Sequence, residues 1–170
     1  MAMFGDKTIF AVEIEECGKE DIFFFCFWCH EKQIGDFSMP VYIKYCINFI
    51  GEFLLYNKNR HLKESCDIHK ERLFYELYDG MMAPDEKIQI KTYKLLSEMP
   101  FGEKRVIFHL DEIGQDSFRD KLSILLINEE EKKRQRLIWR DLKDVVLHEE
   151  FLPLNYVDDV FSELLIYFDE

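Results

Sequence analysis

The sequence predicts an α+β fold: a mainly antiparallel sheet of five or six strands, with helices packed on it and an amphipathic helix at the C-terminus. Expected strands fall in consecutive blocks, two before a helical middle and three or four after it. Strands in blocks favour antiparallel pairing, whereas strands that alternate with helices favour a parallel sheet. The 170 residues are 48% hydrophobic and 15% aromatic, with only 7 Gly and 4 Pro. This is enough apolar surface for one core, so we expect a single domain over residues 1–170.

The first block holds two strands. Apolar residues alternate over Thr8–Glu16, which predicts a strand with one cleaner apolar face. Cys17–Asp21 contains Gly18 and is expected to turn the chain. Ile22–His30 is apolar on both faces, as in a central strand that is covered on both sides.

The helical middle starts near Pro40, which suits the first turn of a helix because its nitrogen has no intrahelical acceptor to lose. Val41–Tyr56 is apolar except for one stripe spaced by four: Lys44, Asn48 and Glu52. Cys66–Tyr78 predicts a second helix. Pro84–Glu98 fits a third helix or a strand, so residues 57–99 hold either two helices or a helix and a strand.

The second block of strands begins at Arg105–Glu112, which alternates and predicts a strand with one wet face. Leu122–Asn128 and Arg134–Arg140 are expected to form a hairpin across a charged loop. A sixth short strand is expected within Val145–Leu152. Alternation in the hairpin places three basic residues on one solvated face: Arg134, Arg136 and Arg140.

The chain closes with its clearest helix. Pro153 precedes this helix, Asn155 is placed to cap it, and Asp158 favours its positive end. One apolar stripe runs along it, made of Val157, Val160, Phe161, Leu164, Leu165 and Phe168.

Charge excludes two classes of partner. There are 34 Asp and Glu against 22 Lys and Arg, which gives a formal net charge of −12. Phosphate repels such a chain, so we expect neither a nucleic-acid nor an anionic-membrane partner. The longest apolar run, Ile22–Cys29, is far below the roughly 18 residues of a membrane span, and the N-terminus lacks the features of a secretory signal. We therefore expect a cytoplasmic protein.

Two short motifs resemble cofactor or metal sites. Cys26–His30 fits the C-x-x-C-H pattern of haem attachment, but in a strand a spacing of three directs the two sulfurs to opposite faces. A zinc site around His61, Cys66 and His69 lacks an evident fourth ligand. We therefore expect no metal and no cofactor, and we interpret the five cysteines as buried thiols.

Two groups have the composition of an acid–base pair: His109 with Asp111, and His148 with Glu149 and Glu150. Neither has a recognisable nucleophile or metal nearby. On the expected strand, His109 and Asp111 are simply neighbours on the wet face. A small metal-dependent or acid–base enzyme that uses either group is the alternative function.

Segments from both halves of the chain carry a resemblance to one family. They are Phe4–Asp6, Phe10–Ile14, the aromatic strand ending in Trp28, Gln33–Phe37, Ser123–Ile127, Arg136–Trp139, Phe151–Pro153, and Val157, Val160 and Phe161 in the last helix. In this order and spacing they resemble the immunity protein 42 family of bacterial polymorphic toxin systems. The chain departs from the family pattern at Cys29-His30-Glu31, where an Ile-Asn-Gly turn is expected.

The resemblance implies a non-catalytic protein that binds a cognate toxin and blocks it. Acidic side chains would steer it to a basic cleft on that toxin. The expected partner-binding residues are Asp36 after the second strand, the hairpin tip Glu129, Glu130 and Glu131, and the pair Glu149 and Glu150. An intracellular scaffold without a toxin partner is a third reading, which only genomic context separates from the first.

Overall fold

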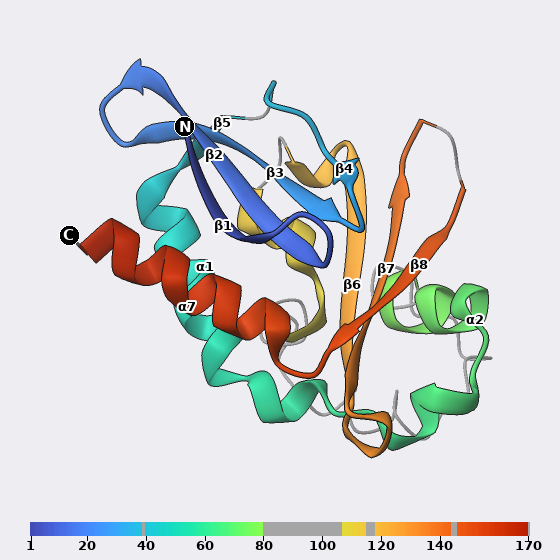
Figure 1. Cartoon of the computed structure of the whole chain (residues 1–170). Helices are drawn as coiled ribbons and strands as arrows, with labels where there is room; N and C mark the ends of the chain where they lie inside the picture. Colours follow the sequence, from blue (N-terminus) through green and yellow to red (C-terminus); the bar gives the residue numbers. More distant parts are fainter. Residues whose placement is uncertain (39, 80–106, 115–117, 144–145, 170) are drawn as a thin grey trace.

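The computed structural model describes residues 1–38, 40–79, 107–114, 118–143 and 146–169, and shows an α+β fold built on two antiparallel sheets (Figure 1). The first sheet has five strands: β1 (Ala2–Asp6), β2 (Phe10–Lys19), β3 (Ile22–Cys29), β4 (Lys32–Ile34) and β5 (Pro40–Tyr42). The second has three: β6 (Leu122–Glu129), β7 (Arg134–Asp141) and β8 (His148–Pro153). The α+β class is confirmed, with the strands divided between two sheets where one was expected.

Strand β3 is the centre of the five-stranded sheet, because it pairs with β2, β4 and β5. Its odd-numbered residues, from Phe23 to Cys29, face the main core, whereas Cys26 lies on the opposite face. The prediction that the two sulfurs point to opposite faces is confirmed, and both cysteines are free. Burial raises the pKa of each of these thiols to about 12, so both stay protonated at neutral pH.

Helices α1 (Ile43–Leu55) and α7 (Tyr156–Asp169) lie side by side below this sheet (Figure 1). Close approach of α7 to β1 requires Gly5, whose φ is +81° and where an added Cβ would lie 2.7 Å from Val160 Cγ2. The predicted stripe of α7 is confirmed in its main part, since Val157, Val160, Phe161 and Leu164 are all buried.

The expected helix start at Pro40 is wrong. Pro40–Tyr42 forms β5, which pairs with β3, and α1 begins at Ile43. Proline has no N–H to donate, and neither the first turn of a helix nor the first residue of a short edge strand requires one. The same residue type is therefore compatible with both positions. The exposed stripe of Lys44, Asn48 and Glu52 is confirmed.

The second sheet is covered on both faces. One face contributes Leu126, Leu137 and Trp139 to the main core. The other contributes Leu125, Ile127 and Ile138 to a smaller core, which is closed by Leu73, Phe74, Leu77 and Tyr78. These four come from α2 (Lys70–Phe74) and the π-helical turn Tyr75–Asp79, so the second predicted helix is confirmed with a later start. The candidate segment Pro84–Glu98 lies outside the described residues.

The predicted strand Arg105–Glu112 is wrong where the structure describes it. Ile107 and Phe108 are helical, and Leu110–Gly114 is a 3₁₀ helix. Asp111 points inward, where it accepts hydrogen bonds from Tyr78 Oη at 2.6 Å and from the Ile124 N–H at 2.9 Å. The alternation of this segment predicts that its polar residues face solvent, but His109 and Asp111 are buried and hydrogen-bonded within the protein.

The turn between β3 and β4 consists of His30 and Glu31, with φ of 47° and 64°. Positive φ at both central residues is the type I′ geometry that Asn-Gly adopts most easily. The turn is held in place because the His30 N–H donates to Ile9 O at 3.2 Å and the Glu31 N–H donates to Lys7 O at 2.7 Å. His30 and Glu31 thus form a turn whose backbone conformation neither residue favours.

A buried polar network joins α7 to the second sheet and to the segment after α1. Arg60, in the 3₁₀ helix Asn57–Arg60, is 0% exposed and forms an ion pair with Asp158. Arg60 Nη1 also donates to Phe53 O at 2.6 Å. Gln135 in β7 donates to Asp158 Oδ2 at 2.8 Å and accepts from the Val157 N–H at 2.9 Å, which satisfies a free N–H of the helix start. Burial lowers the pKa of Arg60 to about 10 against the opposing effect of Asp158, so the guanidinium stays charged near neutral pH.

We predict that Asp158→Asn destabilises the fold by about 3–5 kcal/mol, because it leaves the Arg60 charge buried without a counter-ion. Urea unfolding followed by circular dichroism measures this. Asp159→Asn is the matched control: Asp159 is exposed in the same helical turn, and its loss should cost less than about 1 kcal/mol. Equal effects of the two substitutions would contradict the role of the network.

For the β3–β4 turn, we predict that His30→Asn with Glu31→Gly stabilises the fold by about 1 kcal/mol. Asn and Gly adopt the positive φ of these two positions with less backbone strain than His and Glu. A thermal melt should show a rise in Tm of roughly 2–4 °C. Glu31→Ala removes the same charge but keeps a Cβ, so it should give no such gain. A rise of equal size with alanine would show that charge, and not backbone strain, is responsible.

Candidate partner-binding surface

The expected exposure of Glu129 is wrong. Glu129 is 0% exposed, and its carboxylate accepts from Arg134 Nε at 2.6 Å and lies 3.5 Å from Arg136 Nη1. It is the last residue of β6, and both arginines come from the neighbouring strand β7. The turn segment Lys63–Asp67 packs against this end of β6, so the carboxylate is enclosed and ion-paired.

The expected solvated face of Arg134, Arg136 and Arg140 is also wrong at Arg136, which is buried. Arg136 Nε donates to Glu149 Oε1 at 2.6 Å, and Arg136 Nη1 donates to the carbonyls of Ser65 and Ile68. Glu149 is half-buried by this contact. Glu129 and Glu149 thus hold the arginines of β7 in place, and neither is presented freely to a partner.

Three of the other expected residues reach the surface at separate places. Glu130 and Glu131 are exposed in the 3₁₀ turn after β6, and Glu131 lies 3.4 Å from His61 Nε2. Asp36 lies at the opposite end of β6, 3.7 Å from Lys121 Nζ. The eight residues of β6 span roughly 25 Å, so the structure does not bring these two acidic positions together.

The fourth, Glu150, projects from β8 toward the turn of the first sheet. Its Oε1 accepts from Lys32 Nζ at 3.1 Å, and its Oε2 lies 3.8 Å from His30 Nε2. Like Asp36, it is partly enclosed and already has a basic neighbour.

Both histidines that were candidates for acid–base catalysis make packing contacts in the structure. His109 is buried, stacks on Tyr78 with ring centroids 4.5 Å apart, and has Nε2 3.0 Å from Leu77 O. His148 stacks on Trp139, its register partner in β7. Within the described ranges, no group of three His, Cys, Asp or Glu side chains is arranged to hold a metal ion.

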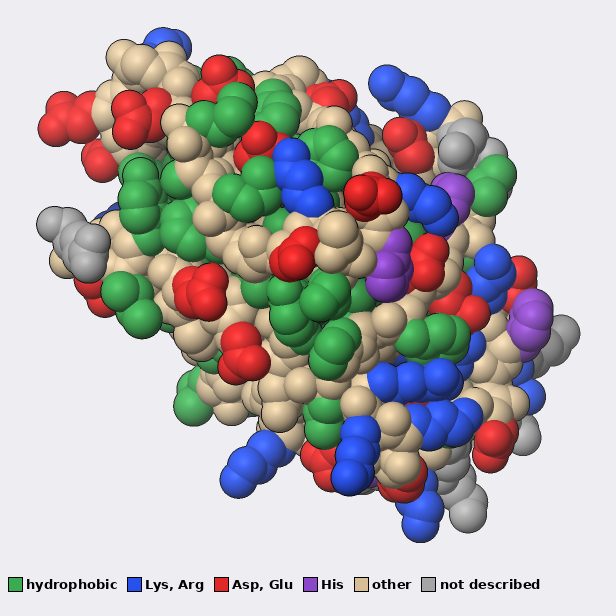
Figure 2. Space-filling view, in the orientation of Figure 1, with side chains coloured by type: hydrophobic (Ala, Val, Ile, Leu, Met, Phe, Trp, Pro, Cys, Tyr) green, Lys and Arg blue, Asp and Glu red, His purple; other side chains and the backbone are tan. Residues whose placement is uncertain are grey.

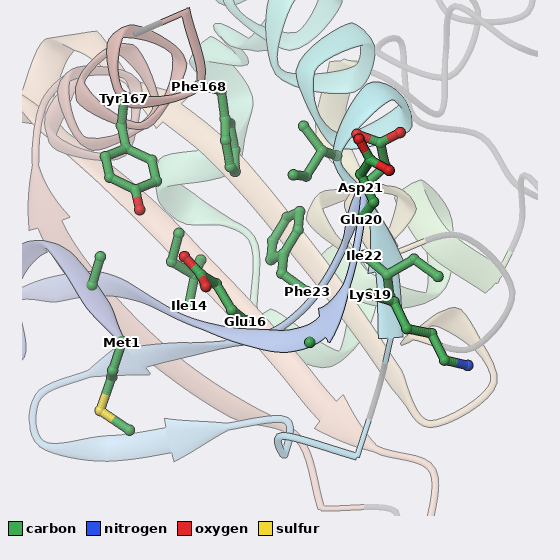
Figure 3. A pocket seen from close by; sticks show the side chains of 13 residues that line it. Met1, Ile14, Glu16, Lys19, Glu20, Asp21, Ile22, Phe23, Tyr167 and Phe168 are labelled. Carbon is green, nitrogen blue, oxygen red and sulfur yellow. The ribbon is translucent and has the colours of Figure 1, made fainter.

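A pocket of about 450 Å³ lies elsewhere, at the free end of the β2–β3 hairpin (Figure 3). The β2–β3 pairing shifts register between Glu16 and Lys19, so Cys17 and Gly18 form a bulge. Gly18 has φ +71° and Asp21 has φ +64°, and together they close the hairpin tightly. The Ile43 N–H donates to Asp21 O at 3.0 Å, which fixes the start of α1 against the hairpin. The turn predicted over Cys17–Asp21 is confirmed at Glu20 and Asp21 only, since Cys17, Gly18 and Lys19 belong to β2. This end of the hairpin forms one wall of the pocket.

The pocket has an apolar floor and an acidic rim. Its apolar lining comes from five elements, β1, β2, β3, α1 and α7, and includes Ile14, Phe23, Ile43, Tyr167 and Phe168. Phe168 packs on Phe23 with ring centroids 5.3 Å apart. Figure 3 shows Glu16 on one side of the opening and Glu20 and Asp21 on the other, with the Lys19 ammonium extending away from them.

Charge is unevenly distributed over the face seen in Figure 2. Acidic side chains gather over the hairpin end of the first sheet, and Lys and Arg gather at the opposite end, near the β6–β7 hairpin. There, Glu130 and Glu131 are followed directly by Lys132, Lys133 and Arg134, which offset their charge. The sequence contains a signal for the other acidic end, in Glu15, Glu16, Glu20 and Asp21 around Gly18, but that signal by itself does not distinguish a pocket rim from a solvated turn.

One protein-family model matches nearly the full length of this chain. The model of the family named immunity protein 42 matches residues 1–167. No curated protein and no solved structure matches the chain. Among the described residues, no helix is long and apolar enough to cross a membrane. With both halves of the described fold inside the matched range, the chain belongs to the immunity protein 42 family.

Proposed function

We propose that this chain is a cytoplasmic, non-catalytic immunity protein that binds a cognate polymorphic toxin and blocks it. The observation that carries the proposal is the family match over residues 1–167. The bound toxin would be neutralised by occlusion, because a tight complex keeps the toxin's own substrate away from its site.

The distribution of charge supports a protein partner with a basic surface. The net charge is −12, and on the face seen in Figure 2 acidic side chains gather over the hairpin end of the first sheet. Complementary potentials raise the rate of encounter between two proteins and disfavour wrong partners. A basic toxin cleft would therefore be approached quickly, in the orientation that these carboxylates select.

The non-catalytic part of the proposal is supported by the roles of the candidate acid–base residues. Asp111 accepts two hydrogen bonds inside the core, and the buried His109 stacks on Tyr78. A general base needs access to a proton on a substrate, which a fully buried and hydrogen-bonded side chain does not have. Binding, and not turnover, is the activity that this arrangement favours.

Co-expression tests the proposal directly. The toxin encoded by the gene adjacent to that of this chain should arrest growth when expressed alone, and this chain should restore growth. The two proteins should then co-elute in size-exclusion chromatography as a stable complex. Arrest that persists in the presence of the chain, together with separate elution, would remove the proposed function.

The hairpin tip offers a second prediction. Glu130→Lys with Glu131→Lys should lower the association rate with that toxin by roughly tenfold at low salt and weaken its salt dependence. The free energy of unfolding should change by less than about 0.5 kcal/mol, because both side chains are exposed. Glu129 is left intact here, since its burial would make any effect structural.

Stopped-flow or surface plasmon resonance measurements at two ionic strengths provide the readout. The control is Glu52→Lys with Asp120→Lys, which makes the same charge change at exposed positions on other elements. If both pairs slow association equally, only net charge matters, and the hairpin tip is not part of the interface.

A further inference from the structure

We propose that the pocket between the β2–β3 hairpin and the end of α7 receives a Lys or Arg side chain of the toxin protein. The inference rests on the proposed function and names a specific place and chemistry for the contact. The pocket lies outside the acidic residues that the sequence suggested as the interface.

The floor of the pocket suits the aliphatic stem of a long basic side chain. Ile14, Phe23 and Phe168 supply apolar surface at its base, and the volume is about 450 Å³. Lys and Arg bury their methylene groups along such surfaces while the charged group stays at the polar edge. Aromatic rings in the lining, among them Tyr167, also favour a cation above their faces.

The rim of the pocket carries three carboxylates that form no ion pair among the described residues. Glu16, Glu20 and Asp21 are exposed, and within the described residues their carboxylates have no ion pair and accept no hydrogen bond from a side chain. This differs from the carboxylates of Glu13, Glu129 and Glu149, each of which has a basic partner. Three carboxylates against two positive groups in the lining, the Lys19 ammonium and the α-ammonium of Met1, leave the rim with a net negative charge that a cation from a partner would neutralise.

A protein occupant, and not a free small cation, is favoured by what lies next to the pocket. Ile22 in the lining pairs with Tyr42 of β5, whose ring is in edge contact with that of Tyr45. These two tyrosines are 51% and 53% exposed. Exposed aromatic residues beside an anchoring pocket are typical of protein–protein interfaces, where a buried anchor is surrounded by contacts that exclude water.

The test is the affinity of the full chain for an inactivated form of the toxin encoded by the adjacent gene, measured by isothermal titration calorimetry. The triple substitution Glu16→Gln, Glu20→Gln and Asp21→Asn removes the rim charge. Asparagine is chosen at position 21 because it tolerates the positive φ of that residue. We expect Kd to rise at least about tenfold, with an unchanged Tm.

The matched control is Glu52→Gln, Asp67→Asn and Asp120→Asn, which makes the same charge change at exposed positions outside the pocket. It should change Kd by less than about threefold. Equal losses for the two triple variants, or an unchanged Kd for the pocket variant, would overturn the inference while leaving the proposed function intact. No complex with the unmodified chain would remove the proposed function and this inference with it.

A second variant fills the pocket and leaves its three carboxylates in place. Ala2→Arg adds a long side chain at a partly exposed lining position of β1, where it would occupy the site itself. It should weaken toxin binding at least as much as the triple variant, whereas Ala2→Ser should not. Spermidine is the probe for a small ligand: if the pocket variant loses spermidine binding but keeps its toxin affinity, the pocket takes a small cation and the inference is wrong.

Discussion

The buried ion pair between Arg60 and Asp158 constrains the rest of this structure. A charge that leaves water must find a counter-ion and hydrogen bonds, or the fold loses several kcal/mol. Arg60 lies after α1, Asp158 lies in the first turn of α7, and Gln135 of β7 bridges to the carboxylate. The three elements meet at this point, where Asp158 contacts both Arg60 and Gln135. The network thus holds the first turn of α7 against the second sheet, and the other end of the same helix carries Tyr167 and Phe168 to the β2–β3 hairpin.

The acidity of the chain separates into two populations with different physical roles. Asp111, Glu129 and Asp158 are buried and hydrogen-bonded, so they specify how elements dock and cannot steer a partner. Glu16, Glu20 and Asp21 are exposed around a pocket and have no ion-pair partner in the part of the chain that the structure describes. Net charge therefore overstates the negative charge that is available at the surface, because the buried carboxylates are held by partners within the fold.

Local pattern predicted much of the fold. The two long strands of the first sheet, the β6–β7 hairpin, the last helix and the α+β class follow from periodicity, because an amphipathic segment has one face that must be buried wherever it docks. Local pattern failed at Pro40, whose missing N–H is compatible with both a helix start and an edge strand. It failed again at His109 and Asp111, whose polar side chains contact Tyr78 inside the protein and not water. The alternation of polar and apolar residues in the sequence is the same in both cases.

The sequence by itself determined the family, the class of fold and the excess of negative charge, since each of these is a property of residue order and type. Only the tertiary structure decided which carboxylates are available. Glu129 and Glu130 are adjacent in the chain, yet one is enclosed against Arg134 and Arg136 while the other is in solvent. The physical reason is that burial and ion pairing depend on contacts between residues far apart in the chain, such as the approach of α7 to the β2–β3 hairpin. Because α7 approaches this hairpin, Glu16 and Glu20, on either side of Gly18, lie at the rim of a pocket.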